Sequence, residues 1–295
     1  MIITTARRLN GKVAIVTGGG TGIGEAISHK FAREGALVTV AGLPGDPVDD
    51  VARRIEVNGG TAYAFSGDLA TEAGARTCVA ETVDEFGRLD VLVNNAGVFL
   101  FTGETQDYPV DAFDETIHNN VRSMFLMTKY ALPHLQKSHG NIIAAGSEAG
   151  VMGEPNNAPY GGTKGFVHAF IRGIAYEQAK HGVRANCVLP GPIDTAWTHA
   201  DTGPMTKKME ELTLASTVMG RRGTPEEVAN VYAFLASDEA SYVTGALWTV
   251  DGGTTIAKGP AGDQAARSFK REPELTLPLA HSREGLANKE VNSAL

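Results

Sequence analysis

Hydrophobic and polar residues follow two different periods along this chain. Short, mainly apolar runs of strand length occur at residues 13–17, 37–41, 62–66, 91–94, 141–145, 184–188 and 247–250. Longer amphipathic stretches with helical spacing lie between them, for example at residues 23–34, 71–86, 112–132, 162–179 and 225–236. Thr224 precedes the last of these stretches and can cap it, with Pro225 in its first turn.

This alternation predicts the fold class. Several of the strand-length runs are almost continuously apolar, as expected for strands that are buried on both faces. Strands that alternate with helices form a parallel sheet covered by helices on both sides. About seven strands in roughly 250 residues fit one doubly wound, Rossmann-like α/β domain. We expect that domain over residues 1–256, followed by a C-terminal extension over residues 257–295.

Composition narrows the partners that we expect. The chain has 295 residues and a formal net charge of −8, and this acidic balance argues against binding to a nucleic-acid backbone. No window approaches the roughly 18 apolar residues of a membrane span, and the N-terminal residues lack the apolar run of a signal peptide. We therefore expect a cytoplasmic protein that binds neither nucleic acid nor membrane.

Cysteine and histidine spacing gives no sign of a metal site. Cys78 and Cys187 lie far apart and fit no disulfide or metal-binding framework, so we interpret them as reduced core thiols. The eight histidines show no HExxH pair or other ligand spacing. We expect no structural or catalytic metal.

Two glycine-containing motifs follow predicted strands. TGGGTGIG, residues 17–24, joins the first strand to the first helix, with glycines at Gly18, Gly22 and Gly24. Such a turn lets the backbone approach a pyrophosphate, which the N–H groups of the helix N-terminus then bind. NNAG, residues 94–97, ends the fourth strand, where small residues leave room for a cofactor. Each motif alone could also be an ordinary turn.

A tyrosine and a lysine supply candidate acid–base chemistry. Tyr160 and Lys164 share one helix face, and an ammonium beside a phenol lowers the pKa of the phenol. Tyr176 and Lys180 have the same spacing, but Tyr160 follows a polar Gly/Pro/Asn-rich loop and opens its helix, whereas Tyr176 lies deeper in that helix and is interpreted as structural. Ser147 stands thirteen residues before Tyr160, just past a strand end, where open α/β sheets place ligands.

Together, these motifs and the later PGPIDT resemble the short-chain dehydrogenase/reductase family in order and spacing, over roughly residues 10–253. The resemblance implies an oxidoreductase that moves a hydride between NAD(P) and a ketone or secondary alcohol. It also implies a homotetramer, with residues 223–253 supplying part of an interface. Two alternatives stay open, a 3-oxoacyl thioester reductase and a non-catalytic dinucleotide-binding sensor.

The resemblance also assigns roles to residues. Tyr160 would exchange a proton with the substrate oxygen, Ser147 would hold that oxygen, and Lys164 would bind the nicotinamide ribose and lower the pKa of Tyr160. Asn120 matches a helix asparagine that supports a water-linked proton path, although Asn119 is its immediate neighbour. The cofactor-binding positions implied are Gly18, Thr21, Gly22, Ile23, Gly24, Asp68, Leu69, Asn95, Tyr160, Lys164 and Ile193.

The choice between NAD and NADP is not made at the usual place. The family ends its second strand with an acid for NAD or carries a base nearby for NADP, whereas this chain has Gly42 followed by Leu43. Thr21 stands where NADP-preferring members often carry a base. We therefore expect NAD, with NADP as the alternative. Asp46 could reach the ribose or could simply be a turn residue.

The segment after PGPIDT, residues 196–216, corresponds to the substrate lid of the family. Mixed side chains there and in a nearby loop could meet a substrate: Trp197, His199, Met205, Met209, Leu212 and Glu154. Such a mixture suits a small cyclic or polyhydroxylated alcohol as well as a 3-oxoacyl thioester. Packing among the lid helices would explain the same residues.

Residues 257–295 lie beyond the resemblance. Pro273 and Pro278 argue against one long helix. ELTLPL, residues 274–279, alternates like an extended segment with one buried face, and the residues from Ser282 could form one short helix. We expect an ordered arm that packs across a neighbouring subunit. A disordered terminus is the alternative.

Overall fold

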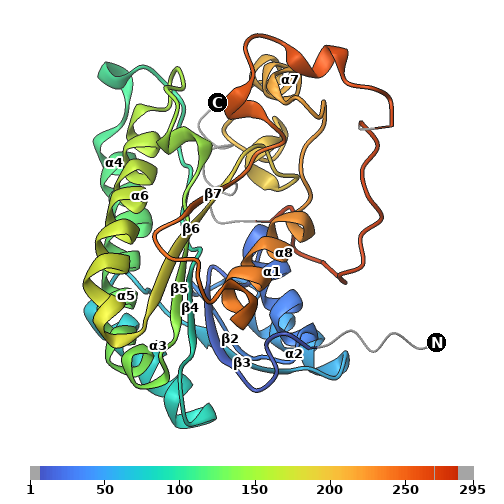
Figure 1. Cartoon of the computed structure of the whole chain (residues 1–295). Helices are drawn as coiled ribbons and strands as arrows, with labels where there is room; N and C mark the ends of the chain where they lie inside the picture. The colour runs from blue at the N-terminus through green and yellow to red at the C-terminus, as the bar shows by residue number, and fades with distance from the viewer. Residues whose placement is uncertain (1–6, 269, 285–295) are drawn as a thin grey trace, which may run out of the picture.

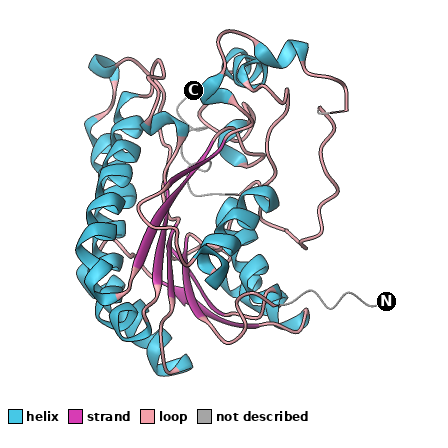
Figure 2. Cartoon of the chain, viewed as in Figure 1, coloured by secondary structure: helices cyan, strands magenta, loops and turns pink. Residues whose placement is uncertain are grey.

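A computed structural model describes residues 7–268 and 270–284. Within these ranges, seven strands form one parallel sheet (Figures 1 and 2): β1 (Val13–Thr17), β2 (Leu37–Gly42), β3 (Thr61–Ser66), β4 (Val91–Asn94), β5 (Asn141–Ala145), β6 (Arg184–Pro190) and β7 (Leu247–Val250). The doubly wound α/β fold predicted from the sequence is confirmed. Each predicted strand is present, with its bounds shifted by at most two residues.

The strand order creates a crevice near the middle of the sheet. The order is β3-β2-β1-β4-β5-β6-β7, and β1 pairs in parallel with both β2 and β4. The chain leaves β1 toward β2 on one side, whereas it leaves β4 toward β5 on the other. The connections therefore diverge above the carboxyl ends of β1 and β4, which is where open α/β sheets bind their ligands.

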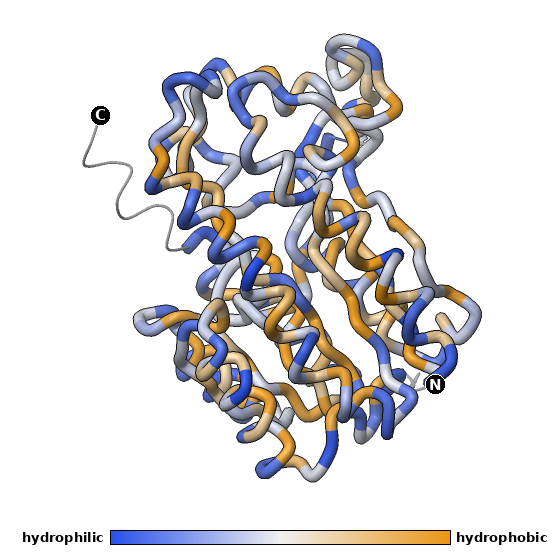
Figure 3. Tube along the Cα trace, turned by 90° about the vertical axis from the view of Figure 1, so that its left-hand side faces the viewer, coloured by the Kyte–Doolittle hydropathy of each residue, from blue (hydrophilic) through white to orange (hydrophobic). Residues whose placement is uncertain are grey.

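Helices cover both faces of the sheet. Those of the described residues are α1 (Gly22–Arg33), α2 (Val48–Val57), α3 (Glu72–Phe86), α4 (Val110–Ile117), α5 (Ser123–Ser138), α6 (Ala158–Gln178), α7 (Lys207–Ser216) and α8 (Pro225–Ala236). One buried apolar cluster joins the sheet to α1, α2 and α8, and a second joins it to α3, α5 and α6 (Figure 1). Figure 3 shows apolar residues concentrated along the strands and the helices that flank them.

The helix predicted over residues 112–132 is wrong in detail. A π-helical turn, His118–Arg122, separates α4 from α5 and contains the buried Asn119 and Asn120. The helix also continues to Ser138 through Pro133, where the pattern predicted an end. Ala131 and Leu135 on either side of Pro133 are fully buried, so packing outweighs the backbone hydrogen bond that the proline removes.

The cap predicted for α8 is present. The Thr224 side chain accepts a hydrogen bond from the Glu227 backbone N–H at 3.2 Å, and the Glu227 carboxylate accepts one from the Thr224 N–H at 2.8 Å. This reciprocal pair satisfies two amides that the helix itself cannot. It fixes the start of a helix that packs closely against α1.

The C-terminal extension returns to its own subunit. Its residues 276–284 run along α8, α1 and α2, with Leu277 buried in the same apolar cluster as these helices. The described part of the extension thus packs on its own chain, and the predicted contact with a neighbouring subunit stays a prediction. The short helix predicted from Ser282 falls mostly outside the described residues. In the described part of the chain, none of the helices has the length and apolar character needed to cross a membrane.

Candidate active site

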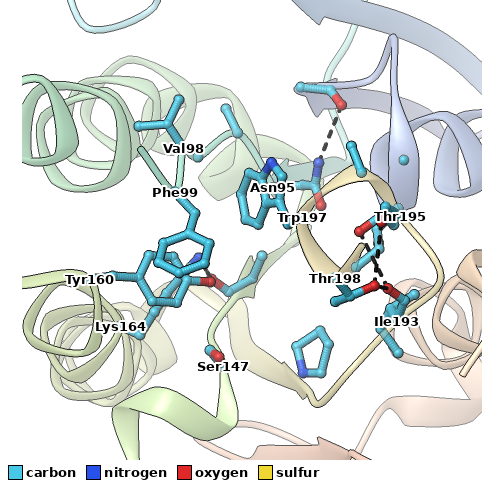
Figure 4. A pocket seen from close by; sticks show the side chains of 18 of the residues that line it. Asn95, Val98, Phe99, Ser147, Tyr160, Lys164, Ile193, Thr195, Trp197 and Thr198 are labelled. Carbon is cyan, nitrogen blue, oxygen red and sulfur yellow. Dashed lines mark hydrogen bonds between the residues drawn. The ribbon is translucent and has the colours of Figure 1, made fainter. Parts of the chain in front are cut away.

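A large cavity opens at the crevice predicted by the strand order. Its volume is about 520 Å³, within the range of small-molecule sites. The catalytic and cofactor-binding residues proposed from the sequence all line this cavity except Asn120, and the candidate substrate contacts all line it except His199. Figure 4 shows Ser147, Tyr160 and Lys164 on one side and Ile193 with Thr195 on the other.

The turn between β1 and α1 has the geometry of a phosphate-binding loop. Gly18 and Gly22 have positive φ angles of 60° and 53°, which residues other than glycine rarely adopt. A Cβ atom on Gly24 would overlap the carbonyl oxygen of Gly18, so only glycine permits this close approach of helix and turn. Thr21 and Ile23 complete the loop at the cavity wall. The residues present therefore fit a dinucleotide pyrophosphate.

An asparagine ties the ends of two central strands together. The Asn95 side chain donates to the backbone carbonyls of Thr17 and Gly18 at 3.1 and 3.3 Å. The backbone N–H groups of Asn95 and Ala96 donate to the Thr17 hydroxyl, each at 3.0 Å. These bonds explain why the NNAG sequence follows β4: it holds the glycine turn in place rather than only leaving space.

An acidic side chain occupies the outer end of the cavity. Gly42, Leu43 and Asp46 all line it. The Asp46 carboxylate accepts a hydrogen bond from the Leu43 N–H at 2.8 Å, and a Cβ atom on Gly42 would lie 2.8 Å from the same carboxylate oxygen. Asp46 therefore takes up the space that the glycine at the end of β2 leaves open.

Asp68 and Leu69, which follow β3, line the same end of the cavity. The Asp68 carboxylate lies 3.0 Å from Nε2 of His118. His118 was not among the residues singled out from the sequence, because it comes from the distant π-helical turn. Ile193 lies on the opposite wall, where the loop after β6 begins.

Ser147, Tyr160 and Lys164 meet at the inner end of the cavity. Ser147 follows β5, whereas Tyr160 and Lys164 lie in the first two turns of α6. The Lys164 ammonium donates to the carbonyl of Ala145 at 2.9 Å and lies 5.5 Å from the centre of the Tyr160 ring. The Ser147 hydroxyl oxygen accepts a hydrogen bond from the Ala149 N–H at 3.1 Å, and its side chain also hydrogen-bonds Tyr160.

Burial dominates the electrostatics of this group. Lys164 is only 4% exposed, and burial lowers its pKa to about 8. Burial also raises the pKa of Tyr160, and the hydrogen bond from Ser147 opposes that increase. In the protein alone, then, the phenol is held neutral. The expected lowering of the Tyr160 pKa by Lys164 stays a prediction for the complex with cofactor.

Asn120 is held just behind the cavity. Its side-chain oxygen accepts from the Val98 N–H at 2.6 Å, and its nitrogen donates to the Val98 carbonyl at 3.0 Å and to the Thr163 hydroxyl at 3.2 Å. A Cβ atom on Gly97 would lie within 4 Å of both Asn120 and the Lys164 ammonium. Asn119, by contrast, bonds Glu115 of its own helix. Asn120 therefore lies near Gly97 and Lys164, and its part in a proton path stays a prediction.

Aromatic and apolar side chains form the wall that faces Tyr160. The ring of Phe99 lies 5.0 Å from that of Tyr160, and the ring of Trp197 lies 6.3 Å from it. Met205, Met209 and Leu212 extend this wall. Phe99 and Val98 were missed in the sequence, although their place directly after NNAG at a strand end was a usable signal.

A partly buried acid lines the cavity next to Ser147. Glu148 directly follows Ser147, and burial, then the nearby carboxylates of Glu154 and Asp251, raise its pKa to about 8. One of its oxygens is buried without a hydrogen-bond partner among the described residues. Glu154 also lines the cavity and accepts from Asn157 at 2.6 Å.

Two residues proposed from the sequence lie elsewhere. His199 is outside the cavity lining, and its ring bonds Asp194 at 2.6 Å and lies 3.4 Å from Glu210. It holds the lid loop in place rather than offering a contact to substrate. Tyr176 is 89% exposed on α6, so it is neither part of the site nor the packed residue that its position suggested.

A glycine turn at a sheet crevice, joined by one cavity to a Ser–Tyr–Lys group, defines a nicotinamide-dependent dehydrogenase site. The family described as enoyl-(acyl carrier protein) reductase matches residues 18–255, and the chain belongs to the short-chain dehydrogenase/reductase family. The predicted family and enzyme class, an NAD(P)-dependent oxidoreductase acting on an alcohol or ketone, are confirmed.

Named relatives agree with this class. L-fucose dehydrogenase of Bos taurus is 40% identical over 88% of this chain and 95% of its own length. Meso-2,3-butanediol dehydrogenase of Serratia marcescens is 36% identical over 85% of this chain and 98% of its own length. The crystal structure of gox2181 superposes with a TM-score of 0.80 at 33% identity and covers 85% of this chain and 98% of that one.

The raised pKa of Glu148 makes stability depend on pH. The pKa of Glu148 is raised from 4.5 to about 8, so the protonated side chain contributes to the free energy of unfolding. This contribution is complete below the unfolded-state pKa and is lost as the pH rises through 8. Glu148→Gln lacks this titration. We expect the melting temperature of the variant, relative to wild type, to rise between about pH 5 and pH 8 and then level off. A difference that stays constant over this range would contradict the assignment.

Proposed function

We propose that this enzyme oxidises a secondary alcohol with NAD, with Tyr160 as the general base and, in the reverse direction, the general acid. The observation that carries the proposal is the meeting of Ser147, Tyr160 and Lys164 at the inner end of the cavity that also contains the glycine turn. A non-catalytic sensor would have no need for these three side chains together at the substrate end.

The residues of the chain can perform each proton step. The Ser147 oxygen already accepts from Ala149, so its own hydrogen is available to the substrate oxygen or to Tyr160. Bound NAD supplies the hydride acceptor. As the alcohol carbon loses hydride, the Tyr160 oxygen takes the hydroxyl proton, and the buried Lys164 ammonium stabilises the phenolate on which this depends. Phe99 and Trp197 keep water from the reacting carbon.

Replacing Tyr160 by Phe tests the mechanism. The ring contacts with Phe99 and Trp197 remain, but the proton donor is lost, so we expect kcat to fall by roughly 10²–10⁴-fold with little change in NAD affinity. Tyr176→Phe is the matched control, since Tyr176 is exposed outside the cavity, and it should keep full activity. The mechanism is wrong if Tyr160→Phe retains near-normal turnover on an alcohol that wild type oxidises.

Asp46 supports the choice of NAD over NADP. Its carboxylate lies beside Gly42 at the end of β2, in the wall of the cavity. There it can accept hydrogen bonds from ribose hydroxyls, whereas a 2′-phosphate would bring a second negative charge close to it. The acid that selects NAD is thus four residues later than the family's usual position.

Cofactor preference tests this assignment. We expect wild type to have the higher kcat/KM with NAD, and Asp46→Asn to reduce the NAD/NADP ratio of kcat/KM by about tenfold, which corresponds to about 1.4 kcal/mol. Asp49→Asn changes an exposed carboxylate three residues along and is the control. An unchanged ratio in Asp46→Asn would show that another group makes the choice.

We propose a substrate with neighbouring hydroxyl groups. L-fucose and 2,3-butanediol, after which two relatives are named, both carry such groups. In this chain, Glu148 and Glu154 line the cavity on the side of Ser147, and the free oxygen of Glu148 can accept from a second hydroxyl. The same acids disfavour a 3-oxoacyl chain, since its apolar carbons would leave a buried carboxyl unpaired.

The ratio of activity on a vicinal diol to that on the matching mono-alcohol measures this recognition, for example 2,3-butanediol against 2-butanol. We expect Glu148→Gln to lower the ratio of kcat/KM values by about tenfold, the value of roughly one buried hydrogen bond. Glu239→Gln, whose side chain is 60% exposed, is the control. Equal ratios in wild type and Glu148→Gln would rule out Glu148 as a substrate contact and leave the role of Tyr160 untouched.

We further propose that the enzyme works as a cytoplasmic homotetramer. Phe125 on α5 and Phe166 on α6 are 48% and 37% exposed, and both rings contact that of Phe170 on α6. On the edge strand β7, Trp248 is 39% exposed. Two such apolar surfaces on different sides of one subunit suit an assembly with two kinds of contact. Free, buried cysteines at positions 78 and 187 fit a reducing compartment. Light scattering on the purified protein measures the assembly state.

A further inference from the structure

Helix α1, which begins at the proposed phosphate-binding turn, carries a buried acid. Backbone N–H groups of the C-terminal extension donate hydrogen bonds to its carboxylate. Glu25, in the first turn of α1, is 0% exposed. One carboxylate oxygen accepts from the Ala280 N–H at 2.7 Å and the other from the His281 N–H at 2.8 Å. Burial raises the pKa of Glu25, and these two bonds oppose the increase. Release of the extension would remove both of these charge-assisted hydrogen bonds from a buried carboxylate, which is energetically costly.

The same segment returns a hydrogen bond to the helix. The Gly22 N–H donates to the carbonyl of His281 at 3.1 Å. Thr21, the N-cap residue, makes no side-chain hydrogen bond to the helix. The extension therefore supplies a cap that the Thr21 side chain does not, and it does so at the first residue of α1, within the turn that fits a pyrophosphate. Ile23 and Gly24, the next two residues, face the cavity.

Further contacts hold residues 276–284, here called the C-terminal strap, across three elements. At its start, Leu277 is 6% exposed and its N–H donates to Glu226 of α8. Near its end, Arg283 pairs with Asp194 in the loop after β6 at 3.0 Å, and Glu284 lines the cavity. The strap thus passes from α8 over the start of α1 to the loop after β6.

Its middle is fixed to α2 as well. The carbonyl of Pro278 accepts from Arg54 at 2.7 Å, and the His281 ring lies 2.9 Å from the Asp50 carboxylate. The contact of Arg54 with the strap ties α2 to the same segment that caps α1.

We propose that the C-terminal strap positions the phosphate-binding turn of α1 and closes the outer wall of the dinucleotide site, so that it strengthens cofactor binding in its own subunit. Glu25 and Leu277 are positioning residues that act through the strap. The segment bears on how firmly the dinucleotide is held, and not on the proton transfer at Tyr160.

A buried leucine in the strap and an exposed leucine just before it provide a matched pair of variants. Leu277→Asn places a polar side chain at a buried position and should release the strap, whereas Leu275→Asn changes a residue that is 52% exposed. We expect Leu277→Asn, and independently Glu25→Gln, to raise the Kd for NADH about tenfold and to speed its dissociation in stopped-flow fluorescence. The KM for NAD should rise in parallel, with kcat changed less than twofold. Leu275→Asn should match wild type.

Limited trypsin cleavage after Arg283 reports separately on whether the strap is docked, and binding of NADH is measured without any substrate. Faster cleavage of Leu277→Asn with an unchanged Kd for NADH would overturn the proposal, because the strap would then be released without consequence. Unchanged cleavage would overturn it too, since Leu277 would not hold the segment. Loss of turnover in Leu277→Asn with an unchanged Kd would place the role of the strap in catalysis, again against the proposal. None of these outcomes depends on the proposed substrate or on Tyr160.

Discussion

The site depends on a single topological constraint, the divergence of the chain on leaving two neighbouring parallel strands. β1 and β4 lie side by side, yet the segments that follow them run to opposite sides of the sheet. The space between those segments cannot be filled by either connection, so a cleft is unavoidable there. The close backbone approach at Gly24 brings the start of α1 to one side of this cleft, and the bonds of Asn95 fix the strand ends that form its floor.

Burial then gives the cleft its chemistry. The same removal from water lowers the pKa of Lys164 and raises those of Tyr160 and Glu148. Each of these three groups is thereby shifted toward its neutral form. A bound dinucleotide and substrate change this balance, because each hydrogen bond they add acts in a medium of low dielectric.

Sequence patterns predicted the parts of the molecule that depend on local order. Continuous apolar runs located every strand, and motif spacing located residues that share one cavity. Long-range relations escaped prediction. The carboxylate of Asp46 fills the place of a missing acid only because the chain bends back at Gly45. The partners of Glu25 lie in the C-terminal extension, too far along the chain for any local pattern to reveal them. Helix α2 was not among the helical stretches named from the sequence. Its buried residues do have helical spacing, at Val48, Val51, Ala52 and Ile55, but nearby prolines obscured the pattern.

The π-helical turn at residues 118–122 shows how packing and chemistry compete within one helix. Successive residues of an α-helix are rotated by about 100°, so the wider turn offsets the buried face of α5 from that of α4 by one residue. Asn120 can face the back of the cleft while Met124 and Met127 still face the core. A single-residue deletion in this turn would restore regular helix but force one of these orientations to be given up. Length, as much as residue identity, is therefore under constraint along this stretch of the chain.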